Sequence, residues 1–137
     1  MPWSHVPHTA DVVIEAEAPT LEALCVEAAE ALTALLVADP AAVAEAAAEP
    51  VQVRAASPEE LLLGWLRAVQ LAFELDRHVG RRFGVKIEGG ALEGVIGGAP
   101  FDVARHGATT EVKGVTYHGL VVERTPAGWR ARVLVDL

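Results

Sequence analysis

The chain carries a histidine and an aspartate three residues apart near its start, in the run HTAD that ends at Asp11. An apolar stretch follows at once, so His8 and Asp11 stand where a loop leads into a strand. Asp11 would then lie near the end of a sheet with His8 on the approach to it, which suits a metal ion or hydrogen bonds to loop amides. These residues leave two interpretations open: a loop that starts the fold, or one half of a site.

A second group of carboxylates stands at the other end of the sequence, in the run VLVDL. Asp136 is followed by Leu137, whose α-carboxylate ends the sequence. Two anionic groups this close repel one another, and a bound cation or a lysine would relieve the repulsion.

The run EVKGVTYHG, residues 111–119, holds charged, aromatic and histidine side chains. On a regular strand, alternation predicts one face with Glu111, Lys113, Val115 and Tyr117 and another with Val112, Thr116 and His118. Lys113 would pair with Glu111, contact another carboxylate or face a partner protein. The alternative is a solvated strand face on which the aromatic serves packing.

Elsewhere the sequence offers little that points to catalysis. Asp102, Arg105 and His106 occur in PFDVARH, which we expect to be a polar loop without a function of its own. The chain has no GxSxG and no GxxxxGK[ST] motif, and its one cysteine, Cys25, falls on the apolar stripe of a predicted helix. We therefore expect that the protein is not an independent enzyme.

The elements that position these residues can be predicted from hydrophobic periodicity. Residues 11–17 form a strand, and helical spacing of leucine and alanine follows from Thr20, a predicted N-cap, to about residue 38. We expect residues 39–50 to be an alanine-rich connection and residues 51–55 to be a strand. A capping box at Ser57 then starts a second amphipathic helix that runs to about residue 75.

Beyond this helix the period changes to two. The runs FGVKIE, LEGVIG, EVKGVTYHGLVVE and WRARVLVD are separated by glycine-containing turns, as in an antiparallel meander. The order of elements predicts an α+β fold: a single domain over residues 1–137, with two amphipathic helices packed on one face of an antiparallel sheet.

Composition narrows the classes of protein further. The 137 residues suit one domain, and no apolar run approaches the roughly 18 to 20 residues of a membrane span, so we expect a soluble, cytoplasmic protein. The net charge of −8 opposes direct, tight binding to nucleic acid, because phosphate contacts draw on lysine and arginine. The helix faces are used up against the sheet, so we expect a monomer.

The sequence resembles the archease family over nearly its whole length and in order. The resemblance is carried by HTAD, TLEAL, EELLLGWL, PFD followed by RH, TEVKGVTYHGLVVE and the terminal WRARVLVDL. It implies a small α+β protein that activates an RtcB-type RNA ligase in tRNA splicing and RNA repair. As a protein cofactor, it would promote guanylylation of the ligase and allow multiple turnover.

The same resemblance implies a metal site formed by Asp11, Asp136 and the Leu137 terminus. Oxygen ligands of this kind favour a hard divalent cation, calcium first, with magnesium or manganese as alternatives. The resemblance also implies a functional role for Lys113, and we expect His8 and His118 to face the partner or act at the site.

Two other functions fit the sequence less well. A general chaperone or a tRNA-binding subunit of an RNA-modification complex is the first, and binding to tRNA would reveal it. The second is a metal-dependent hydrolase, which needs a general base, and His8 is the only candidate near the proposed site.

Overall fold

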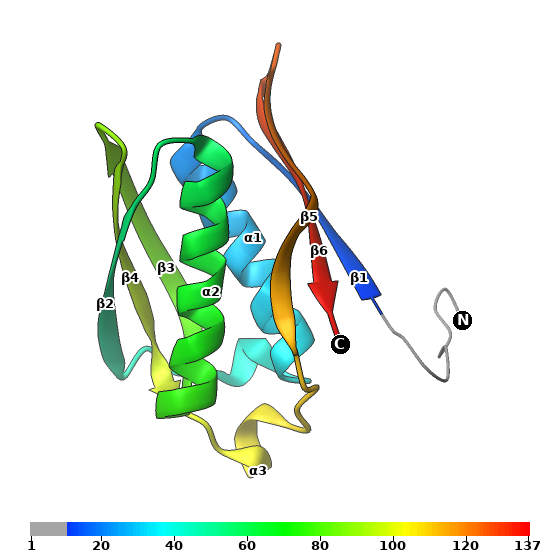
Figure 1. Ribbon diagram of the computed structural model, residues 1–137. Helices are drawn as coiled ribbons and strands as arrows, with labels where there is room; N and C mark the ends of the chain where they lie inside the picture. The colour runs from blue at the N-terminus through cyan, green and yellow to red at the C-terminus, as the bar shows by residue number, and fades with distance from the viewer. Residues whose placement is uncertain (1–10) are drawn as a thin grey trace.

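The computed structural model describes residues 11–137, which form an α+β fold with one continuous hydrophobic core (Figure 1). No helix in this part of the chain is long and apolar enough to cross a membrane. The elements in chain order are β1 (Asp11–Ala18), α1 (Leu21–Leu36), the 3₁₀ turn η1 (Pro40–Ala42), β2 (Ala47–Arg54), α2 (Pro58–Asp76), β3 (His78–Glu88), β4 (Ala91–Pro100), α3 (Val103–His106), β5 (Gly114–Thr125) and β6 (Gly128–Asp136).

The strands form two antiparallel sheets, with strand orders β1-β6-β5 and β2-β4-β3. The α+β class and the two amphipathic helices are confirmed, but the sequence predicted one sheet where the structure has two. Helices α1 and α2 lie between these sheets, and each helix contacts both (Figure 1). Alternation along a strand shows which side chains are buried but not which strand is the neighbour, so this division was not visible in the sequence.

Both long helices begin at the predicted capping residues. The Thr20 hydroxyl accepts a hydrogen bond from the Ala23 N–H at 3.1 Å, and the Ser57 hydroxyl accepts one from the Glu60 N–H at 3.2 Å. Strand β2, by contrast, begins at Ala47, inside the segment predicted to be a connection. Pairing with β4 extends the strand through this alanine-rich stretch, although its own composition does not favour a strand.

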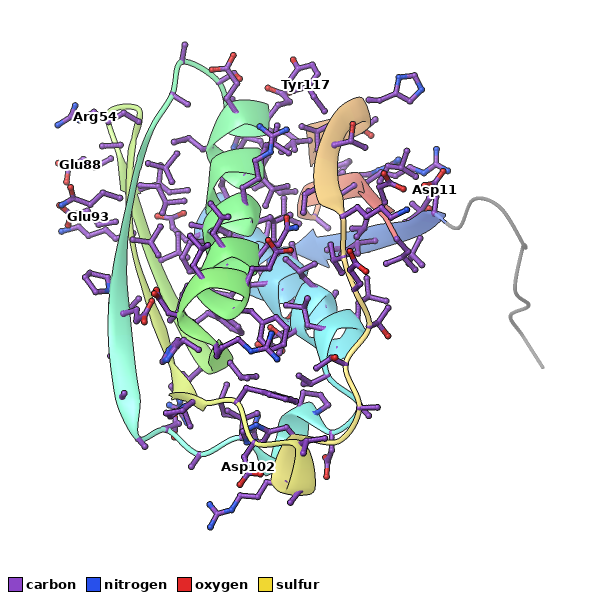
Figure 2. The ribbon with its side chains drawn as sticks, turned by 60° about the horizontal axis from the view of Figure 1, so that its bottom comes forward. Asp11, Arg54, Glu88, Glu93, Asp102 and Tyr117 are labelled. Carbon is purple, nitrogen blue, oxygen red and sulfur yellow. The ribbon has the colours of Figure 1, made fainter. Side chains whose placement is uncertain are left out.

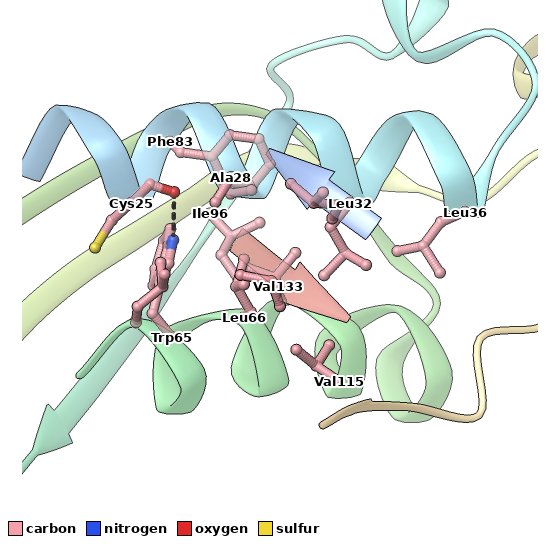
Figure 3. Packing of buried hydrophobic residues seen from close by; sticks show 14 of the residues in the cluster. Cys25, Ala28, Leu32, Leu36, Trp65, Leu66, Phe83, Ile96, Val115 and Val133 are labelled. Atoms are coloured by element: carbon pink, nitrogen blue, oxygen red, sulfur yellow. Dashed lines mark hydrogen bonds between the residues drawn. The ribbon is translucent and has the colours of Figure 1, made fainter. Parts of the chain in front are cut away.

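Trp65 occupies the middle of the core and joins the two helices. Its Nε1 donates to the carbonyl oxygen of Cys25 at 2.9 Å, so its one polar atom is satisfied (Figure 3). Burial, with a smaller contribution from Glu22, raises the pKa of the Cys25 thiol to about 12. The thiol is therefore neutral at physiological pH and unsuited to act as a nucleophile.

Gly94 of β4 makes room for the Trp65 ring, because a Cβ at this position would lie 2.5 Å from Trp65 Cζ3. We expect Gly94→Ala to lower the free energy of unfolding by about 1–3 kcal/mol through overpacking. Gly84 of β3 is a matched control, since a Cβ there meets nothing within 4 Å. Urea denaturation of the two variants tests this expectation, and equal midpoints would contradict it.

Candidate functional site

Strand β6 brings the two ends of the described chain together. Asp11 of β1 lies directly opposite Asp136 of β6, and Gly114 of β5 lies opposite Asp136 on the other side. The first and last strands are thus neighbours, as the hypothesis of two half-sites required. Asp11 and Asp136, far apart in the sequence, are paired across the two strands at one end of this sheet.

Both aspartates lie on the face of this sheet that is turned away from the helices. Ile14 is buried and pairs with Val133, which is also buried, so even-numbered β1 residues face the core. On β6 the odd-numbered residues are buried, so Asp11 and Asp136 both lie on the opposite face, with Asp11 exposed and Asp136 half-buried. Figure 2 shows Asp11 at the outer end of β1. Residues directly opposite on one face have Cβ atoms about 4.5–5.5 Å apart, so the two carboxylates repel.

The acidic residues on this face of the sheet differ in whether they form ion pairs. Further along the same face Glu15 pairs with Arg132 at 3.8 Å and Glu123 pairs with Arg130 at 3.3 Å. No ion pair within residues 11–137 involves Asp11. Glu15 and Glu123 thus have ion-pair partners on this face, whereas Asp11 has none among residues 11–137.

The proposed metal ligands can be compared with this arrangement. Asp11 and Asp136 supply two side-chain carboxylates, while the side chain of Leu137, one residue from Asp136, packs against the core. These oxygen donors fit a hard cation. Among the described residues no three His, Cys, Asp or Glu side chains gather as a metal-binding group. Asp11 and Asp136 are therefore the two side-chain carboxylates that a cation would meet at this end of the sheet.

The backbone of Lys113 is hydrogen-bonded to Asp136, at the acidic end of the sheet. Its N–H donates to the carbonyl oxygen of Asp136 at 2.8 Å, and its side chain is exposed. The predicted regular strand from residue 111 is wrong, because β5 begins only at Gly114. Nor is Lys113 joined to Glu111 by an ion pair in the described part of the chain, which removes the predicted charge pair.

His118 lies in an irregular part of β5. The pairing with β6 shifts between Thr116 and Val121, so four residues of β5 stand opposite one residue of β6. Gly119 in this bulge has φ +70°, a conformation that favours glycine. The bulge turns both Tyr117 and His118 to solvent, so they do not alternate between faces as predicted. Both side chains therefore lie outside the core.

Two other expectations have different outcomes. His8 lies outside the described residues, so its position relative to Asp11 stays a prediction. The PFDVARH segment, predicted to be a loop, contains the short helix α3 (Val103–His106), capped by Asp102, whose Oδ1 accepts from the Ala104 N–H at 3.0 Å. His106 is buried and its Nδ1 accepts from the Asp102 N–H at 3.1 Å. This cluster stabilises a turn and lies far from Asp11 (Figure 2).

Sequence reasoning did not single out two residues of α2 that contact the Lys113 segment. Gln70 Nε2 donates to the carbonyl oxygen of Val112 at 3.0 Å, and Arg67 Nε donates to that of Val115 at 3.2 Å. Gln70 is only 6% exposed. The signal that could have found Gln70 is a glutamine directly after Val69, among the apolar residues of the second helix. A buried amide needs a hydrogen-bond partner, so such a residue points to a polar contact.

Taken together, the fold and this site define a small α+β protein whose first and last strands present paired carboxylates at one sheet end. The chain belongs to the archease family: residues 3–137 match the Archease protein family (MTH1598/TM1083). The predicted family is thereby confirmed.

Similar proteins agree with this assignment. The protein archease of Methanopyrus kandleri is 41% identical over 143 residues, covering 100% of both chains. That of Methanosarcina acetivorans is 32% identical, covering 98% of this chain and 95% of its own. The solution structure of protein 1598 from Methanobacterium thermoautotrophicum superposes with a TM-score of 0.69 at 26% identity, covering 98% and 96% of the two chains.

Proposed function

We propose that this chain activates an RtcB-type RNA ligase in tRNA splicing and RNA repair. It would act as a protein cofactor that promotes guanylylation of the ligase and so permits multiple turnover. Membership of the archease family supports the proposal. The observation that carries it is the juxtaposition of Asp11, Asp136 and the Lys113 segment at one solvent-exposed sheet end.

The proposed cofactor is a divalent cation, calcium first, with magnesium or manganese as alternatives. Asp11, Asp136 and the Leu137 terminal carboxylate would hold it, and repulsion between the paired carboxylates favours such binding. When bound, the cation supplies a concentrated positive charge that attracts oxygen ligands of a partner or nucleotide. The pairing of β1 with β6 places the Asp11 and Asp136 side chains opposite one another.

The proposed partner is the ligase rather than RNA. A ligase that binds RNA and GTP presents basic surfaces, and a chain with net charge −8 complements such surfaces while repelling RNA phosphates. Lys113 would then place one positive charge at the otherwise acidic tip. We further propose that the protein acts as a monomer in the cytoplasm.

A multiple-turnover ligation assay with the cognate ligase tests this function. With RNA in large excess over ligase, we expect the protein to raise product well above one equivalent per ligase, because a spent ligase can be guanylylated again. Product that stays at one equivalent in its presence would contradict the proposal. A gel-shift assay with tRNA at physiological salt is the companion measurement, since tight binding by this protein alone would favour the tRNA-binding alternative.

A further inference from the structure

The segment that carries Lys113 has little regular structure of its own. It precedes β5, which begins at Gly114, and follows an isolated bridge between Val37 and Thr109. Lys113 itself is held to β6 by one backbone hydrogen bond, from its N–H to Asp136. A single hydrogen bond contributes about 0.5–1.5 kcal/mol, which is too little to fix a chain segment.

Helix α2 adds contacts on both sides of Lys113, beyond the hydrogen bond from the Thr110 N–H to the Leu36 carbonyl and the β5–β6 pairing that starts at Gly114. Gln70 donates to the Val112 carbonyl at 3.0 Å, one residue before the lysine, and Arg67 donates to the Val115 carbonyl at 3.2 Å, two residues after it. The side chains of Val112 and Val115 are buried, at 2% and 3% exposure. The backbone is therefore clamped at two points, and the exposed lysine side chain projects from between them.

Gln70 is adapted to this contact. It lies in the buried stripe of α2, where a leucine or methionine would serve packing without the cost of burying an amide. Its Nε2 also donates to Glu74 Oε1 at 3.0 Å, which orients the amide toward Val112. Figure 1 shows α2 running alongside the start of β5, as these hydrogen bonds from α2 require.

We infer that Gln70 and Arg67 are positioning residues that hold Lys113 in place relative to the Asp11–Asp136 pair. The inference rests on the proposed function, because it gives the position of Lys113 a purpose in ligase activation. Neither residue touches the acidic pair. Both act through the backbone of the segment and neither would ligate the cation.

The first test is Gln70→Met, which keeps the side-chain length and removes both hydrogen bonds of the amide. We expect ligase activation to fall about tenfold, which corresponds to about 1.4 kcal/mol. The calcium-dependent rise in melting temperature should remain, because Asp11, Asp136 and the terminus are unchanged. Amide hydrogen exchange at Lys113 should accelerate, whereas the Val133 amide in the core of β6 should exchange at the parent rate.

Thr33→Val is the matched control. Thr33 is a buried polar residue of α1, 3% exposed, whose hydroxyl donates to the Ala29 carbonyl at 3.0 Å. This variant also loses one buried hydrogen bond, but it does not touch residues 112–115. We expect it to activate the ligase as the parent does. Arg67→Met is the second variant, for use if Gln70→Met does not fold. The Arg67 side chain is exposed, so this substitution should be tolerated.

The outcomes separate this inference from the proposed function. If the parent activates the ligase and both α2 variants do so equally, with unchanged exchange at Lys113, the inference is wrong. An equal loss in Thr33→Val would also overturn it, because general destabilisation would then explain the effect. If the parent does not activate the ligase, the proposed function fails, and Lys113 exchange alone decides whether α2 positions the segment.

Discussion

Asp11→Asn is expected to abolish the calcium-dependent rise in melting temperature and most of the ligase activation. The substitution removes one of two carboxylates that face each other across β1 and β6 and keeps the side-chain shape. Loss of a residue that merely supports a metal ligand costs about 10- to 100-fold in affinity, so loss of a direct ligand should cost at least as much. Fold and core should persist, because Asp11 is exposed.

The size of the thermal effect can be estimated. Calcium at about 100 times its Kd stabilises the folded protein by about 2.7 kcal/mol. For a chain of this length that is a rise on the order of 10 °C. Without calcium, the variant should be more stable than the parent by about 0.2–1 kcal/mol, because like charges directly opposite on a sheet are destabilising. Calorimetry with and without calcium, together with ligation turnover, measures both effects.

Glu15→Gln is the control for Asp11→Asn. Glu15 lies on the same strand and the same face and is also exposed, but it pairs with Arg132. We expect the calcium response and ligase activation of this variant to match the parent. If Asp11→Asn loses the calcium response and still activates fully, the cation is structural only. A parent without any response to calcium, magnesium or manganese would show that Asp11 and Asp136 do not form the proposed cation site.

Lys113→Ala is expected to lower ligase activation while leaving the calcium-dependent rise in melting temperature in place. Ligase activation should fall by at least about tenfold, a loss of about 1.4 kcal/mol of transition-state stabilisation. The calcium-dependent rise in melting temperature should remain or increase, because a positive charge near the carboxylates is removed. The backbone N–H that donates to Asp136 is retained, so the local fold should persist.

Lys86→Ala controls for the loss of a lysine. Lys86 is the only other lysine of the chain and is exposed on β3, in the other sheet. It should leave activation unchanged, and Lys113→Arg should retain part of it if positive charge is what matters. A Lys113→Ala variant that activates as well as the parent would remove the lysine from the mechanism. If Lys113→Ala loses calcium binding, Lys113 supports the Asp11–Asp136 pair itself.

The sequence by itself determined the features that depend on neighbouring residues. Ser57 and Thr20 cap their helices through backbone groups three residues away, so both helix starts could be read locally. The apolar run after Asp11 likewise predicted a strand over residues 11–17, and β1 spans Asp11–Ala18. The family also followed from short runs of sequence. The candidate ligands, by contrast, came from resemblance to that family and not from spacing.

Only the tertiary structure decided which distant residues meet. The register of β1 against β6 places Asp11 opposite Asp136, and the division of strands into two sheets encloses the helices between them. The contact of Gln70 with Val112 joins a helix to an irregular segment that no local pattern describes. Local propensities cannot specify such contacts, because strand pairing and buried polar bonds depend on groups that the folded chain brings together from far apart in sequence.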